Sequence, residues 1–227
     1  MTTRTLHSRL TITVISLFCL CTAAAAQTRQ AIIRYDSVHH PVVGLHGMVV
    51  SQNDLASEIG RDILRQGGNA VDSAVATGFA LAVTLPRAGN LGGSGFMLVH
   101  LAESGETVAL DYRSIAPLAS DPELFRLGED EVDMDALTHG AKAAAVPGTV
   151  AGLYEAWQRW GSLPWKDLVA PARQLAADGI VVTHDLSFAL SEGALTMGLF
   201  PSSAAIYLRP DGGGLRPGER LVQSDLA

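Results

Sequence analysis

The chain has 227 residues, of which 48% are hydrophobic and 17% charged, a composition that can build a packed core and excludes a disordered tail. Lys and Arg number 16 against 23 Asp and Glu, which gives a formal net charge of −7. This acidic balance argues against a protein that binds nucleic acid by neutralising phosphates, so we expect no nucleic-acid partner.

The first 26 residues have the three parts of a secretory signal peptide. Arg4 and Arg9 precede an apolar run over residues 10–20, and small residues follow up to Ala26. We expect cleavage after Ala26, which leaves a mature domain over 27–227 in the periplasm or outside the cell. A retained signal anchor is the alternative interpretation.

Two helices are expected early in the mature chain. Residues 48–51 predict a short strand, and Ser51 with Asp54 has the chemistry of a capping box for the helix that follows. Gly67 is placed to end that helix. The second helix, over 70–85, has small apolar residues on all sides, so we expect it to be buried.

A strand hairpin is expected next. Residues 96–101 form a nearly continuous apolar run, which is typical of a strand covered on both faces. A turn over 103–106 leads into a partner strand over 107–112. A central sheet buried on both faces needs more strands than these, so further strands are expected downstream.

The rest of the chain predicts helices and loops, which gives an α+β order overall. We expect a helix between Pro147-Gly148 and Gly161, a helix from Pro164 to Ala177, a helix from Asp185 onward, a loop or hairpin over 201–218, and the first turn of another helix over 223–227. The chain is therefore interpreted as part of a longer domain.

The glycine-rich segment Gly89–Gly95 is not interpreted as a phosphate cradle. Phosphate-binding loops run from a strand into the amino end of a helix, whereas this segment connects a helix to a strand. We interpret it as a tight connection against a crowded backbone.

Arg113 is the candidate binding residue. Strand alternation puts Asp111 and Arg113 on one side of the strand end and Leu110 and Tyr112 on the other. A planar guanidinium binds a carboxylate through two parallel hydrogen bonds, so Arg113 is suited to hold a substrate carboxylate. The alternative is a local ion pair between Arg113 and Asp111.

No metal or cofactor is implied. Both cysteines, Cys19 and Cys21, lie in the removable segment, so the mature chain has no disulfide and no thiolate nucleophile. The histidines show no metal-ligand spacing, and His100 is interpreted as a core imidazole within an apolar strand.

Several blocks, in the same order along the chain, resemble the γ-glutamyltransferase (glutathione hydrolase) family. They are Gly67-Gly68-Asn69-Ala70-Val71-Asp72-Ser73-Ala74-Val75-Ala76, Ala88-Gly89-Asn90-Leu91-Gly92-Gly93-Ser94-Gly95-Phe96-Met97, Asp111-Tyr112-Arg113, Val146-Pro147-Gly148-Thr149-Val150-Ala151-Gly152, Pro171-Ala172 with Leu175-Ala176, and Leu221-Val222-Gln223. The resemblance covers nearly everything after the signal peptide.

This resemblance implies an exported precursor that cuts itself into a large and a small subunit, which together form the αββα sandwich of the N-terminal-nucleophile hydrolases. Residues 27–227 would be the N-terminal part of the large subunit, so the sandwich is only partly present. Arg113 matches the family arginine that binds the substrate's α-carboxylate, while Ser114 departs from the glutamate that commonly follows. The nucleophilic threonine is expected downstream, and this chain alone is predicted to be inactive.

The implied reaction is γ-glutamyl transfer or hydrolysis. Its substrates would be glutathione or other γ-glutamyl compounds, its acceptors an amino acid, a peptide or water, and its partner the small subunit of the same precursor. The alternatives are a glutaryl or cephalosporin acylase of the same family, and an inactive fragment that only binds γ-glutamyl compounds.

Overall fold

The computed structural model describes residues 41–121 and 123–227, so the predicted signal peptide lies outside the described residues. The chain divides into two units, Met1–Leu45 and His46–Ala227. The described residues of the first unit, 41–45, form no helix or strand. Within the described ranges, no helix is both long enough and apolar enough to cross a bilayer.

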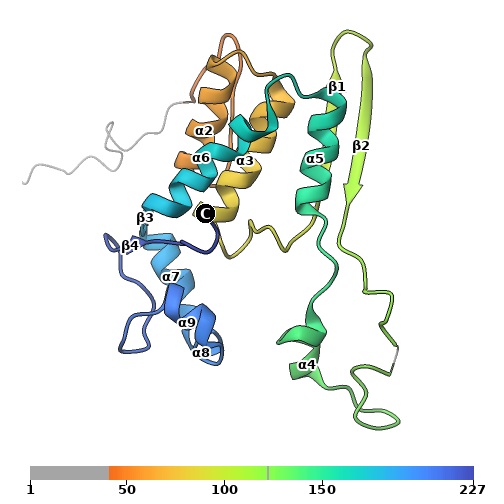
Figure 1. Ribbon diagram of the computed structural model, residues 1–227, viewed down its shortest axis with the longest axis vertical. Helices are drawn as coiled ribbons and strands as arrows, with labels where there is room; N and C mark the ends of the chain where they lie inside the picture. The colour runs from red at the N-terminus through yellow and green to blue at the C-terminus, as the bar shows by residue number, and fades with distance from the viewer. Residues whose placement is uncertain (1–40, 122) are drawn as a thin grey trace, which may run out of the picture. The chain divides into compact units, whose positions relative to one another are not determined.

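The second unit contains helices and two small antiparallel sheets (Figure 1). The elements in chain order are α2 (Asp54–Arg65), α3 (Ala70–Thr84), β1 (Gly95–Leu101), β2 (Glu106–Tyr112), α4 (Met134–Thr138), η2 (Ala141–Ala143), α5 (Thr149–Trp160), α6 (Trp165–Asp178), β3 (Ile180–Val181), α7 (His184–Glu192), α8 (Ala194–Gly198), α9 (Pro201–Tyr207) and β4 (Arg220–Leu221).

The start of α2 differs from the prediction. Asn53, not Ser51, is the N-cap, and its side chain accepts a hydrogen bond from the backbone N–H of Ala56. Ser51 instead lies two residues before the cap, where its hydroxyl donates to the carbonyl of Asn53. Residues 48–51 form no strand, because none of the described segments pairs with them. Gly67, with φ of 93°, follows the helix as predicted.

Helix α3 is the centre of the core. It packs against α2, α5 and α6 (Figure 1). Val75, Phe79 and Val83 are among its buried residues. The full set of buried residues lies on all sides of the helix, which confirms the predicted burial. Ser73 donates to the carbonyl of Gly60, where the two helices α2 and α3 approach closely.

The N-terminus of α3 is tied to the loop between α5 and α6 by a buried carboxylate. Asp72 accepts the backbone N–H of Asn69 at 2.9 Å, which completes a capping box. Its two oxygens also accept the backbone N–H of Ser162 at 3.0 and 3.2 Å, and the Ser162 hydroxyl donates to the same group. Asp72 therefore joins segments that are 90 residues apart in sequence.

The hairpin of β1 and β2 forms as predicted, with Gly95 opposite Tyr112 and Leu101 opposite Glu106. The prediction that both faces are buried is wrong for this chain. Phe96 is 67% exposed and Leu98 76% exposed, since the helices cover only the other face of the two strands. His100 is also exposed and pairs with Thr107 at 3.0 Å, so it is not a core imidazole.

The later elements agree with the sequence in part. Helices α5, α6 and α7 lie where they were predicted, and Pro171 sits inside α6. Residues 201–207, the first part of the segment predicted as a loop or hairpin, form the short helix α9, with Pro201 in its first turn. Residues 223–227 form a single turn in which the backbone N–H of Ala227 donates to the Gln223 carbonyl at 3.2 Å, as in the predicted first turn of a helix. Gln223 holds this turn in place, because its buried side chain donates to the carbonyl of Val83 in α3.

Candidate functional site

Arg113 lies at the end of β2, beside the glycine-rich turn that leads into β1. The register that pairs Gly95 with Tyr112 brings Ser94 next to Arg113. The Arg113 guanidinium donates to Ser94 Oγ at 3.1 Å and is exposed. Within the described part of the chain it forms no ion pair with a carboxylate, which leaves its charge free to meet an anion from outside.

Asp111 does not form the alternative ion pair with the Arg113 guanidinium. Its Oδ1 accepts a hydrogen bond from the backbone N–H of Arg113 at 2.9 Å. This bond to the N–H two residues on is the one that defines an Asx-turn. Its carboxylate therefore fixes the backbone of Arg113, while Ser94 holds the guanidinium. Asp111 is exposed while Leu110 and Tyr112 are half-buried, which agrees with the predicted alternation of the strand. Arg113 itself lies just beyond the strand.

Residues 146–149 form backbone hydrogen bonds with the residues on both sides of this site. The carbonyl of Gly93 accepts the backbone N–H groups of Gly148 at 2.9 Å and Thr149 at 3.1 Å. On the other side, Ile115 and Val146 exchange backbone hydrogen bonds of 3.4 and 2.9 Å. The residues that flank Ser94 and Arg113 are thus held by one continuous segment, which leads directly into α5.

Tyr112 fills the space between β2 and α5. A Cβ on Gly148 would overlap the Tyr112 carbonyl, and a Cβ on Gly152 would overlap its ring. A Cβ on Gly95 would lie 2.9 Å from the same ring. Burial raises the pKa of the Tyr112 phenol above its usual value, so the hydroxyl stays protonated and donates to the Phe96 carbonyl.

Gly152→Ala tests this packing. In a helix interior alanine is preferred over glycine by about 1 kcal/mol, so the change would ordinarily stabilise the helix. Here we expect the free energy of unfolding to fall by about 1–3 kcal/mol, because the new methyl group displaces the Tyr112 ring. Chemical denaturation measures the change. Gly198→Ala is the matched control, since nothing lies within 4 Å of its added methyl group. An equal effect of both substitutions would contradict the assignment.

The sequence did not single out Ser94 as a site residue. The sequence places Ser94 in a connecting turn, and only the strand register brings it next to Arg113. The one available signal was a hydroxyl side chain within a run of glycines. Ser94 Oγ in turn donates to Ser114 Oγ at 3.2 Å. The guanidinium is therefore hydrogen-bonded to one neutral hydroxyl group, which is itself hydrogen-bonded to a second.

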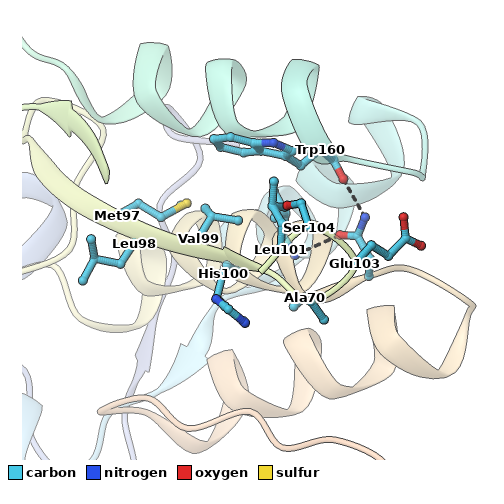
Figure 2. Close-up of a pocket in the computed structure, with 13 residues that line it drawn as sticks. Ala70, Met97, Leu98, Val99, His100, Leu101, Glu103, Ser104 and Trp160 are labelled. Carbon is cyan, nitrogen blue, oxygen red and sulfur yellow. Dashed lines mark hydrogen bonds between the residues drawn. The ribbon is translucent and has the colours of Figure 1, made fainter. Parts of the chain in front are cut away.

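A cavity of about 540 Å³ lies at the other end of the hairpin. Figure 2 shows the side chains of β1 along it, with Trp160 of α5 and Ala70 of α3 also in its wall. Gly95 and Leu101 mark the two ends of β1, about 20 Å apart at the usual strand rise. This mostly apolar cavity, which the sequence did not predict, is therefore separate from Arg113.

The other candidate chemistries receive no support from the described residues. The glycine-rich turn runs from α3 into β1, the direction that argues against a phosphate cradle. Within residues 41–121 and 123–227, no group of three or more His, Cys, Asp or Glu side chains is placed to hold a metal ion. His139 contacts Thr138 and Asp135 through the same ring nitrogen, an arrangement that does not form a proton relay.

Comparisons with known proteins place the chain in a family. Residues 56–227 match a family model described as gamma-glutamyltranspeptidase. The chain is 40% identical over 211 residues to the glutathione hydrolase proenzyme of Escherichia coli K12, a match that covers 91% of this chain and 36% of that protein. It is 42% identical over 193 residues to the acylase ACY 1 proenzyme of Pseudomonas sp. SE83, covering 82% of this chain and 34% of that protein.

Solved structures give the same result. A gamma-glutamyltranspeptidase of Helicobacter pylori matches with a TM-score of 0.79 and 39% identity, over 82% of this chain and 53% of that chain. A cephalosporin acylase of Bacillus halodurans matches with a TM-score of 0.68 and 26% identity, over 85% of this chain and 37% of that chain. The chain spans about a third of the length of the curated relatives that it matches.

Proposed function

Because the chain belongs to the gamma-glutamyltranspeptidase family, we propose that the full-length protein transfers or hydrolyses the γ-glutamyl group of glutathione and related γ-glutamyl amides. Its fold is the α+β fold of the N-terminal-nucleophile hydrolases, of which this chain contains part. The observation that carries the proposal is the Arg113 guanidinium at the end of β2, which donates to a hydroxyl and pairs with no carboxylate of the described residues.

In this reaction Arg113 binds the α-carboxylate of the γ-glutamyl donor. A threonine that self-cleavage frees at a new amino terminus, downstream of residue 227, attacks the γ-carbonyl carbon, and its own α-amino group takes the hydroxyl proton. The amide bond breaks as the leaving amine takes up a proton. Water or an amino acceptor then attacks the γ-glutamyl ester and restores the threonine hydroxyl. The chain described here supplies the carboxylate anchor and lacks the nucleophile.

The partner proposed for this chain is the remaining polypeptide of the same precursor, including the small subunit. The exposed apolar face of β1, with Phe96 and Leu98, supports this assignment, because such a surface is rarely left facing water. The relatives have additional polypeptide, since the match covers 53% of the H. pylori chain and 36% of the E. coli protein. The names of the curated relatives, which include proenzymes, agree with a cleaved precursor.

We also propose that the protein is exported and acts in the periplasm or outside the cell. The support is the signal-like pattern of the first 26 residues and the absence of cysteine from residues 27–227. Amino-terminal sequencing of the mature protein should begin at Gln27. A protein that retains Met1 and stays in the cytoplasm would overturn this part of the proposal.

A glutaryl or cephalosporin acylase is the second candidate, because acylase proenzymes are as similar to the chain as the glutathione hydrolase is. The full-length protein should be assayed with γ-glutamyl anilide and with glutaryl anilide, which differ only in the α-amino group. We expect the γ-glutamyl compound to have the higher kcat/KM. The opposite preference would favour the acylase, and binding of γ-glutamyl compounds without turnover would favour a binding-only protein.

A further inference from the structure

Three side chains form a short hydrogen-bonded chain at the end of the hairpin. Arg113 Nη1 donates to Ser94 Oγ at 3.1 Å, and Ser94 Oγ donates to Ser114 Oγ at 3.2 Å. Ser94 and Ser114 are half-buried, whereas Arg113 is exposed. The hydrogen bonds therefore connect two half-buried hydroxyl groups to a guanidinium at the surface.

The hydroxyl groups hold the guanidinium without neutralising it. A carboxylate in the place of Ser94 would also orient Arg113, but its negative charge would compete with an anionic ligand for the same N–H groups. A serine accepts one hydrogen bond and adds no charge. Arg113 carries further N–H donors, and these stay available for a bidentate contact with a carboxylate.

The backbone around both serines is fixed. Gly93, just before Ser94, accepts two backbone hydrogen bonds from the start of α5, and Ile115, just after Ser114, exchanges two with Val146. Arg113 has its own backbone N–H bound to Asp111. Because the backbone on both sides of the site is fixed by these hydrogen bonds, the Ser94 hydroxyl has a defined position. It therefore restricts the conformations of the long Arg113 side chain.

We propose that Ser94 is a positioning residue for Arg113, with Ser114 as its support, and that this arrangement sets the affinity for the donor's carboxylate. This inference rests on the proposed function. Ser94 acts through the guanidinium and touches no reacting atom. Its effect should therefore appear in the KM for carboxylate-bearing donors and leave kcat nearly unchanged.

The test uses the full-length, self-processed protein and γ-glutamyl anilide. Ser94→Ala removes only the hydroxyl, and we expect it to raise KM about tenfold, as for the loss of one hydrogen bond to a charged group, while kcat changes less than twofold. Ser94→Thr keeps the hydroxyl and should largely restore KM. Ser114→Ala should raise KM by a smaller factor, because it acts one bond further from the guanidinium.

A double-mutant cycle separates positioning from a general structural effect. In an Arg113→Ala background, Ser94→Ala should raise KM no further, since there is no guanidinium left to orient. An equal rise in both backgrounds would overturn the inference. A normal KM for Ser94→Ala beside a raised KM for Arg113→Ala would overturn it too, with the proposed function intact. An unmutated protein without γ-glutamyl turnover would overturn both proposals together.

Discussion

Replacement of Arg113 by alanine should raise the KM for γ-glutamyl donors by a factor of 30 or more. Arg113 is exposed in this chain, and we expect the remaining polypeptide of the full-length protein to shield it. Truncating one partner of a shielded guanidinium–carboxylate contact costs about 2–5 kcal/mol, and 2 kcal/mol corresponds to roughly 30-fold. In this structure the Arg113 guanidinium has only Ser94 as a side-chain hydrogen-bond partner among the described residues, so its removal disturbs little of the fold. Steady-state kinetics of the full-length protein measure the effect.

Two substitutions serve as controls for that result. Arg113→Lys keeps the charge but loses the planar fork, so its KM should lie between those of the unmutated protein and the alanine variant. Arg87→Ala removes another exposed arginine, which pairs with Asp185, and should leave KM unchanged. If Arg113→Ala and Arg87→Ala behave alike, Arg113 does not bind the donor.

The largest loss of stability is expected for Asp72→Ala. Asp72 is fully buried and accepts hydrogen bonds from Asn69 and Ser162, which belong to separate segments. Its removal leaves several donors without an acceptor, each at a cost of about 1–3 kcal/mol. We expect the free energy of unfolding to fall by about 3–5 kcal/mol, as measured by chemical denaturation of the full-length protein.

Asp62→Ala is the matched control for Asp72. Asp62 is an exposed acidic residue of α2 that pairs with Arg61 and Arg65, and such surface pairs contribute less than about 1 kcal/mol. Asp72→Asn should be intermediate, because the amide oxygen accepts while its NH₂ group faces other donors. Equal stability of the Asp72→Ala and Asp62→Ala variants would show that the buried carboxylate does not join the two segments.

The sequence predicted most helices because their ends carry strong local signals. Gly67 and Gly161 follow helices as expected, and the apolar residues of α3 indicated its burial. The cap of α2 was misplaced by two residues, since Ser51 and Asn53 both have capping side chains and only the folded backbone decides between them. Helix α9 was missed because Pro201 indicates a turn as readily as a first helical position.

The sequence singled out Arg113 as the candidate binding residue but did not predict its contact with Ser94. A single residue type at a strand end suffices to suggest carboxylate binding, whereas the contact with Ser94 spans 19 positions and depends on the hairpin register. The burial of β1 on both faces was predicted from its apolar sequence. An apolar sequence does not tell which faces of a strand are covered, and in this chain Phe96 and Leu98 are exposed.

The most direct test compares two donors that differ only by the α-carboxylate. γ-Glutamyl anilide carries this group, and 4-aminobutanoyl anilide lacks it. We expect the unmutated full-length protein to prefer the γ-glutamyl compound by a factor of 30 or more in kcat/KM, and Arg113→Ala to lose nearly all of that preference. A preference of the same size in both proteins would contradict the role of Arg113 as the carboxylate anchor.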